Sequence, residues 1–179
     1  MNGKRVVCRN QMELNEALAQ GKAVELRSGR YRVVTRGDES PVIHVKGTAR
    51  LMVETKGGSW PLIVARGAAQ VTVRSSDKSR PLVKASGESR HSVVSRGRSE
   101  PVVVVRATAQ SEVRAYEESR PIAEIRGNGR SKVIGSGESH PVVMVTSRGT
   151  DPGVETGEHS VITMFSDGEL VRVPLRMAS

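Results

Sequence analysis

Residues 41–60 read PVIHVKGTARLMVETKGGSW, and residues 61–80 read PLIVARGAAQVTVRSSDKSR. A proline opens each unit, and the same spacing of 20 residues places prolines at 41, 61, 81, 101, 121 and 141. A fixed period of this length is typical of repeat proteins in which each unit stacks on the next. Glycine recurs at the seventh place of most ten-residue halves, so each unit is itself two related segments.

Apolar and polar residues alternate within each unit, counted from its proline. Alternation with a period of two predicts β-strands whose odd places face inward and whose even places face outward. The apolar third place holds Ile43, Ile63, Val83, Val103, Ala123 and Val143, and the thirteenth holds Val53, Val73, Val93, Val113 and Val133. Small residues at the ninth place, such as Ala49 and Ala69, indicate a thin, flattened core.

This pattern predicts an all-β fold, a single-stranded parallel β-helix or β-solenoid. Each turn holds about 20 residues and two short strands, and each strand pairs with its equivalents above and below. Roughly seven turns, at about 4.8 Å each, give a rod on the order of 34 Å long. One turn cannot bury its apolar face alone, so the stability of the fold depends on stacking.

The two ends of the chain depart from the repeat. Near the N-terminus we expect a short strand at 4–8 and a helix at 11–19 that begins at Asn10, ends before Gly21 and covers the open end of the solenoid. Its expected apolar stripe is Met12, Leu14, Ala17 and Leu18. Near the C-terminus we expect a turn at 150–153 and two strands, 161–165 and 170–173, around a hairpin turn at 166–168. The predicted divisions are 1–21 for the N-terminal strand and capping helix, 22–150 for the solenoid and 151–179 for the C-terminal capping strands.

Two stretches carry a resemblance to known β-helices. Residues 14–31, LNEALAQGKAVELRSGRY, resemble the N-terminal cap of pectin-lyase-like right-handed β-helices, in which a helix, a glycine turn and an apolar strand precede Gly-x-Tyr. The ten-residue unit, for example QVTVRSSDKS at 70–79, is similar to the repeats of small parallel β-helix proteins of actinobacteria and their phages. The first resemblance implies a right-handed coil, and neither implies a catalytic residue.

Composition favours anionic partners and argues against a membrane protein. The formal charge is +9, from 28 Lys and Arg against 19 Asp and Glu. Such a charge favours association with polyanions but does not decide the fold. No run of residues approaches the roughly 20 apolar residues of a membrane span, and no secretory signal precedes the repeat. We expect a cytoplasmic protein, or one in the virion or host cytoplasm if a phage encodes it.

Basic residues recur in two columns of the repeat. Stacked like charges about 5 Å apart repel unless an anion or a neighbouring acid offsets them, so the columns predict a polyanion-binding ladder. The alternative is a solvated face with interspersed acids, and the scarcity of aromatic residues argues against base stacking. The predicted ladder consists of Lys46, Arg66, Arg106 and Arg126 at the sixth place, and Arg50, Arg90 and Arg130 at the tenth.

Catalytic and metal-binding patterns are weak. The four histidines occupy different columns, and no outward column repeats Asp, so we expect no catalytic residue, cofactor or metal. A group near the C-terminus could hold a metal, although a polar loop explains it better. That group is Asp151, Glu155, Glu158 and His159. We also expect no wide apolar patch, because Val64, Val104 and Met144 share the fourth place with His44, Lys84 and Glu124.

Three functions follow from these observations. The first is a non-catalytic structural or interaction protein that binds another protein or itself through its faces or ends. The second is a module that binds nucleic acid or an anionic cell-wall polymer through the basic ladder. The third and weakest is a carbohydrate-active enzyme, since long β-helices often carry paired carboxylates for that chemistry.

Overall fold

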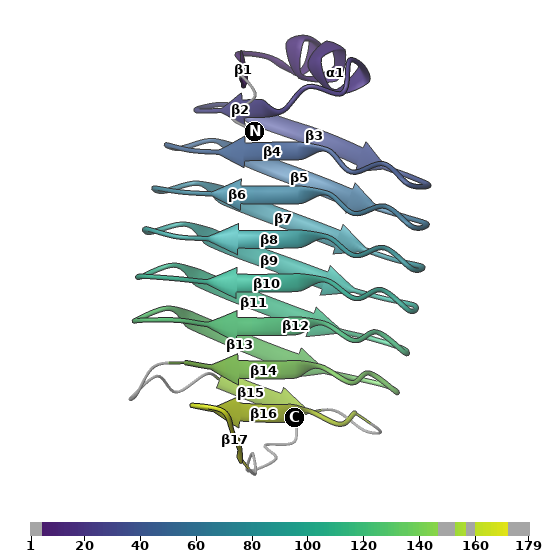
Figure 1. The fold of residues 1–179 in the computed structure, drawn as a ribbon, viewed down its shortest axis with the longest axis vertical. Coiled ribbons are helices and arrows are strands. Elements are labelled where there is room, and N and C mark those ends of the chain that lie inside the picture. The colour runs from purple at the N-terminus through teal and green to yellow at the C-terminus, as the bar shows by residue number, and fades with distance from the viewer. Residues whose placement is uncertain (1–4, 147–152, 157–159, 172–179) are drawn as a thin grey trace.

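The computed structural model describes residues 5–146, 153–156 and 160–171. It shows a β-solenoid of about seven stacked turns with about 20 residues per turn and one helix near the N-terminus (Figure 1). Each turn contributes one strand to each of two parallel sheets, here named sheet A and sheet B. The predicted all-β solenoid is therefore confirmed, and the right-handed sense of the coil stays a prediction.

Sheet A contains ten strands in the order β1-β2-β4-β6-β8-β10-β12-β14-β16-β17. All neighbours are parallel except the last pair, β16 and β17, which is antiparallel. The strands are β1 (Val6–Cys8), β2 (Val24–Leu26), β4 (Val42–Val45), β6 (Leu62–Ala65), β8 (Leu82–Ala85), β10 (Val102–Val105), β12 (Ile122–Ile125), β14 (Val142–Val145), β16 (Thr163–Ser166) and β17 (Glu169–Val171).

Sheet B contains seven parallel strands and lies behind sheet A in the view of Figure 1. Most of its strands have six residues, whereas the repeated strands of sheet A have four. The strands are β3 (Arg30–Thr35), β5 (Arg50–Thr55), β7 (Gln70–Ser75), β9 (Arg90–Ser95), β11 (Gln110–Ala115), β13 (Arg130–Gly135) and β15 (Gly153–Thr156).

The register follows the sequence period. In sheet A, Ile63 pairs with Ile43 on one side and with Val83 on the other. The proline column is part of the same stack, because the carbonyl of Pro61 accepts a hydrogen bond of 2.9 Å from the N–H of Leu82. Proline has no N–H to donate to the ladder, and the start of a strand tolerates this absence. This explains the fixed place of proline in the repeat. Equivalent residues of successive units therefore lie next to one another in space.

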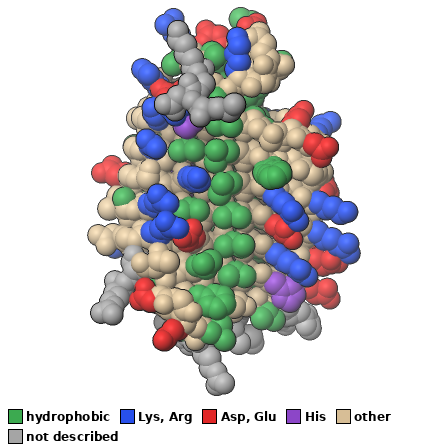
Figure 2. Space-filling model, in the orientation of Figure 1, with side chains coloured by type: hydrophobic (Ala, Val, Ile, Leu, Met, Phe, Trp, Pro, Cys, Tyr) green, Lys and Arg blue, Asp and Glu red, His purple; other side chains and the backbone are tan. Residues whose placement is uncertain are grey.

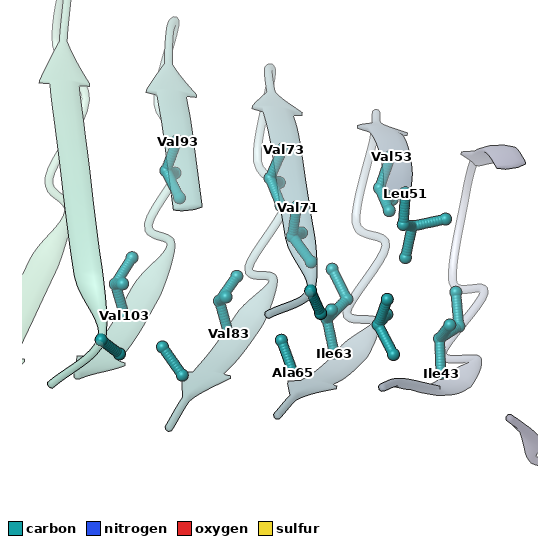
Figure 3. Packing of buried hydrophobic residues seen from close by; sticks show 14 of the residues in the cluster. Ile43, Leu51, Val53, Ile63, Ala65, Val71, Val73, Val83, Val93 and Val103 are labelled. Carbon is teal, nitrogen blue, oxygen red and sulfur yellow. The ribbon is translucent and has the colours of Figure 1, made fainter. Parts of the chain in front are cut away.

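The core is a narrow layer of aliphatic side chains between the two sheets (Figure 3). Ile63, Val73 and Val83 have no exposed surface, and each comes from an odd place of the repeat. The ninth place forms one inner corner with Ala49, Ala69 and equivalents, which are also fully buried. Small corner residues let the two sheets close on each other, as the sequence predicts.

Buried hydroxyl groups line the opposite inner corner. The nineteenth place is Ser in every described unit, and the fifteenth is Thr or Ser in the N-terminal turns. Thr35 Oγ1 donates to Ser59 Oγ at 3.1 Å, and the hydroxyls of Ser95 and Ser99 lie 2.7 Å apart. Ser79 Oγ also donates to the carbonyl of Ser76 at 2.8 Å. These bonds satisfy polar groups that water cannot reach, and the sequence pattern alone did not reveal them.

Helix α1 (Gln11–Ala19) covers the N-terminal end of the stack. The Asn10 side chain accepts a hydrogen bond of 2.9 Å from the N–H of Glu13, which confirms Asn10 as the N-cap. Gln11 Nε2 donates to the carbonyl of Arg32 at 2.8 Å, and Gln11 Oε1 accepts from the N–H of Arg32 at 2.9 Å. One side-chain amide therefore replaces the missing neighbour strand at the free edge of β3.

The expected apolar stripe of α1 is correct only in part. Leu14 and Ala17 are buried, and Leu18 packs partly against the core. The prediction that Met12 belongs to this stripe is wrong, because 67% of its surface is exposed. A nine-residue helix that lies across the narrow end of a rod presents only about one residue per turn to it, so the fourth member of the stripe finds no neighbour.

Parallel stacking continues beyond residue 150. Val133 pairs with Val154 and Val143 pairs with Met164, both with a shift of 21 residues instead of 20. One additional residue in this last turn weakens the sequence repeat but not the stacking. Residues 150–152 of the expected turn lie outside the described residues, and Gly153 begins β15. Strands β16 and β17 form a hairpin around Asp167 and Gly168, both with positive φ.

The turns require a left-handed backbone at the seventh and seventeenth places. Glycine fills most of them, for example Gly67 and Gly87 with φ of 67° and 71°. Asp77 and Glu117 adopt the same conformation but accept hydrogen bonds from the N–H groups of Gly57 and Gly97, at 3.1 and 2.6 Å. A side-chain acceptor thus offsets the conformational cost at these two acids.

Ala107 also has a positive φ, 56°, but its methyl group can accept no hydrogen bond. We predict that Ala107→Gly stabilises the protein by up to about 1 kcal/mol, because relief of left-handed strain exceeds the added entropy of the unfolded chain. Chemical denaturation monitored by circular dichroism measures the change. Asp77→Gly is the control and should not stabilise, since it loses its hydrogen bond. Equal stabilisation by both variants would contradict this account of the turns.

Candidate functional site

The predicted basic residues all lie along one edge of the solenoid. The sixth place follows each sheet A strand, and the tenth place begins each sheet B strand, so both columns flank the turns that lead from sheet A to sheet B. We name these turns, residues 46–50, 66–70, 86–90, 106–110 and 126–130, the basic edge. It brings together Lys46, Arg66, Arg106, Arg126, Arg50, Arg90 and Arg130.

The two edges of the solenoid differ in charge. Glu88 is the only acid in the turns of the basic edge. The turns of the opposite edge mix acids and bases, which pair with each other: Arg80 contacts Glu100 at 2.9 Å, and Arg98 contacts Glu118 at 2.8 Å. The net positive charge of the sequence is therefore concentrated on one side of the rod.

Lys46 belongs to the basic edge and also forms a contact that stabilises the first turn. Its Nζ lies 2.7 Å from Glu25 Oε2, and Arg27 Nε lies 2.8 Å from Glu25 Oε1. Glu25 is only 5% exposed. The hydrogen bonds from Lys46 and then Arg27 lower the pKa of Glu25 to about 2, against the opposing effect of burial. This pair of contacts fixes the first turn, and the sequence repeat gave no signal for Glu25 because β2 precedes the first proline.

The other basic residues of the predicted ladder differ in whether they form an ion pair. Arg126 forms an ion pair with Glu124, two residues earlier on the same strand face. Among the described residues, the other five form no ion pair: Arg50, Arg66, Arg90, Arg106 and Arg130. At the tenth place, Gln70 and Gln110 separate the arginines. Arginines two turns apart are about 10 Å from one another, close to the Debye length, which limits their repulsion.

An apolar stripe runs along the outward face of sheet A, contrary to the expectation of no wide apolar patch. Figure 2 shows it as a continuous vertical band. The expectation failed because it weighed only the fourth place, whereas the second place is aliphatic in every repeat and only half-buried. We define the apolar stripe as Val42, Leu62, Leu82, Val102, Ile122 and Val142 at the second place, with Val64, Val104 and Met144 at the fourth.

Two opposite charges interrupt the fourth place of this stripe. Lys84 lies between Val64 and Val104 in the column, and Glu124 lies between Val104 and Met144. Glu124 uses its Oε1 for the ion pair with Arg126. Lys84 is exposed and forms no ion pair within the described residues. An unpaired ammonium group flanked by valines is unusual on a face that presents an aliphatic surface.

A large exposed side chain and a hollow lie beside the stripe. Trp60 is separated from β6 by Pro61 alone and is 62% exposed. The hollow, about 550 Å³ in volume, adjoins the other half of the stripe. Its lining residues are Glu100, Arg120, Ile122, His140, Val142 and Thr163. Trp60 and His140 occupy the same place of the repeat, before β6 and β14 respectively.

The interior contains a histidine–serine pair. His91 Nε2 lies 2.9 Å from Ser89 Oγ, because Ser89 ends the turn before β9 with its side chain buried on the inner side, as that of His91 is. Both side chains are buried, with 5% and 0% exposure, so a substrate cannot reach the hydroxyl. His91 Nδ1 and the hydroxyls of Ser111 and Ser131, in the same column, have no hydrogen-bond partner. This inward column thus becomes polar toward its C-terminal half.

No group of three or more potential metal ligands occurs among the described residues. The predicted C-terminal candidate, Asp151, Glu155, Glu158 and His159, lies outside the part whose side chains the structure describes. His44 and His140 are separated by five turns.

Comparison with protein-family models, with curated proteins and with solved structures gives no match. In the part of the chain that the structure describes, no helix has the length and apolarity needed to cross a membrane.

The buried imidazole of His91 predicts a dependence of stability on pH. Burial lowers its pKa from the ordinary 6.5 to about 4. The unfolded chain therefore binds a proton between about pH 6.5 and pH 4 that the folded chain does not, so the free energy of unfolding falls as the pH falls through this window. We predict that His91→Val removes up to about 3 kcal/mol of that fall.

Urea denaturation of both proteins at pH 7, 5.5 and 4.5 measures this difference. Val71, which occupies the same column one turn earlier, shows that valine fits the site. His140→Val is the matched control for the loss of a histidine at an exposed place. Parallel pH profiles for wild type and His91→Val would contradict the assignment.

Proposed function

We propose that the protein is a non-catalytic β-solenoid that acts as a structural or interaction protein and binds a protein surface through the outward face of sheet A. The observation that carries this proposal is the apolar stripe, which extends over six consecutive strands, β4 to β14. A rigid, flat array of aliphatic side chains is suited to a second flat surface, since the outward side chains of the stack are held in register by the backbone.

The surroundings of the stripe support recognition rather than simple exposure. Charged residues flank it on both edges, as a polar rim flanks the apolar centre of a protein interface. The single tryptophan of the chain is exposed next to it, and aromatic residues are enriched at binding hot spots. The similarity of the repeat to those of actinobacterial and phage β-helix proteins supports a virion or cytoplasmic setting for this interaction.

A second candidate function is polyanion binding by the basic edge. The observation that favours it is the separation of charge between the two edges, with five arginines that form no ion pair within the described residues. Arg50, Arg90 and Arg130 recur two turns apart along a straight rod. Such a row can follow the phosphates or carboxylates of an extended polymer. The two proposals use different surfaces and can be tested separately.

For the first proposal, we predict that Leu82→Thr with Ile122→Thr abolishes protein binding by sheet A. Threonine keeps the strand propensity but removes aliphatic surface. Immobilised wild type and variant are compared for retention of the purified protein itself and of proteins from the native host. The matched control is Val94→Thr with Ile134→Thr, at half-buried outward places of sheet B. Equal retention by all three proteins would exclude the stripe as the binding surface.

For the second proposal, we predict that Arg50→Gln, Arg90→Gln and Arg130→Gln together lower the slope of log affinity against log salt by about 3 for duplex DNA or heparin. Glutamine already occupies this column at Gln70 and Gln110, so the fold should be unaffected. Fluorescence anisotropy at graded salt concentrations measures the slope.

The control for charge is the triple change Arg80→Gln, Arg98→Gln and Arg120→Gln on the opposite edge, which removes the same formal charge. It should leave the slope close to that of wild type. Negligible binding by the wild type at low salt, or equal losses in both triple variants, would contradict a specific role for the basic edge.

A further inference from the structure

We propose that the partner of sheet A is a second copy of this chain, bound face to face with the two solenoid axes antiparallel and a two-fold axis parallel to β10. This inference rests on the proposed function of the apolar stripe and adds the identity and register of the partner. It follows from the complementarity of the side chains placed at equal distances on either side of β10, since a homodimer with a two-fold axis uses one self-complementary surface.

In this arrangement each place of the repeat faces the same place of the other copy. Strand β10 faces itself, β8 faces β12 and β6 faces β14. At the second place, Leu82 faces Ile122 and Leu62 faces Val142, so the contacts from β6 to β14 are aliphatic. At the fourth place, Val104, which is 7% exposed, faces its own equivalent, and Val64 faces Met144. The stripe is therefore complementary to itself from β6 to β14, whereas Val42 in β4 faces Thr163 in β16.

The two charges within the stripe obey the same symmetry. Lys84 lies one turn before Val104 and Glu124 lies one turn after it, so Lys84 of one copy faces Glu124 of the other, twice per dimer. This pairing provides an acid for a lysine that forms no ion pair in its own chain. Glu124 can accept a hydrogen bond from the Lys84 ammonium group of the other copy, because Arg126 contacts Oε1 and leaves Oε2 available.

Other registers leave these charges opposed to apolar side chains. A shift of one turn places Lys84 against Val104 or Met144. Parallel solenoid axes reverse the strands, so that the fourth place lies over the second and Lys84 lies over Leu82. Each of these arrangements desolvates charges without a partner, which costs several kcal/mol per ion. Only the register centred on β10 pairs both.

Trp60 and the hollow obey the symmetry as well. Because β6 faces β14, Trp60 of one copy lies over His140 of the other. His140 lines the hollow of about 550 Å³, together with Val142 and Ile122. An indole that is 62% exposed in one chain thus meets a concave site in the partner. The place of this open hollow and the exposed aromatic are independent of the charge pairing and indicate the same register.

The charged residues along the two edges of the proposed interface limit the affinity of the dimer. Arg106 meets its own equivalent at the basic edge, where solvent and salt screen the repulsion. On the opposite edge, Glu100 faces its own equivalent and Arg80 faces Arg120 of the other copy, so this rim also brings like charges together in solvent. The five facing strands of four residues, β6 to β14, give a footprint on the order of 300 Å² per copy, which is smaller than stable interfaces and typical of weak, transient ones. We therefore expect a reversible dimer with a dissociation constant in the micromolar range.

The first experiment uses the wild-type protein. Sedimentation velocity from about 1 to about 200 µM should show a monomer–dimer equilibrium. The emission of Trp60, the single tryptophan, should shift to shorter wavelength with the same midpoint, because the indole leaves water on association. A strict monomer throughout this range overturns the inference. A dimer without any shift places the interface elsewhere and overturns it as well.

The second experiment exchanges the charges. Lys84→Glu and Glu124→Lys each create two like-charge contacts per dimer and should weaken self-association at least tenfold. An equimolar mixture of the two single variants restores both contacts and should form a heterodimer with wild-type affinity, as should the double variant Lys84→Glu/Glu124→Lys. Lys78→Glu, on the opposite edge outside the stripe, is the control for net charge and should leave dimerisation unchanged.

These outcomes separate the inference from the proposed function. Recovery in the mixture shows that each variant folds and that residues 84 and 124 face each other. Two single variants that dimerise as well as wild type overturn the register. If the wild type is a monomer but retains a host protein through Leu82 and Ile122, the proposed function stands and the second copy is excluded as the partner.

Discussion

The parallel backbone ladder at a repeat of 20 residues is the constraint on which the rest of the structure depends. Each strand of a turn bonds to its equivalents above and below, as Ile63 does with Ile43 and Val83. The ladder therefore converts each place of the repeat into a column of touching side chains. A contact between stacked side chains is repeated at every turn, whether it stabilises the fold or destabilises it. This explains why the inward places accept little besides Val, Ile, Ala, Ser and Thr, and why turns use glycine so consistently.

Much of this architecture was predictable because it is encoded in a strict period. The proline spacing, the alternation and the glycine turns predicted the strands, the two sheets and the facing of odd places. What could not be predicted from the repeat was either non-periodic or hidden by averaging. Glu25 precedes the first proline, and the additional residue before β15 breaks the pattern. The contact of Gln11 with Arg32 joins a helix to a strand edge, which no column describes.

The surface was harder to interpret than the core. The basic columns were visible in the sequence, and the structure places them on one edge. The segregation of charge emerged only when the two kinds of turn were seen on opposite sides of the rod. The expectation of no wide apolar patch was wrong because it weighed only the mixed fourth place. The alternation already assigns the second place to the outward side, where Leu62, Leu82 and Ile122 form a surface and not a core.

The amide of Gln11 has a consequence for how large an assembly of this protein can become. A solenoid whose end strands are free can add further solenoids end to end without limit, as fibril-forming sheets do. Here one short side chain occupies the donor and the acceptor of Arg32 at the first strand of sheet B. Axial growth from that end would have to break both bonds and move α1. The proposed contact across the flat side of sheet A is not hindered in this way, so it would give small, closed groupings and not filaments.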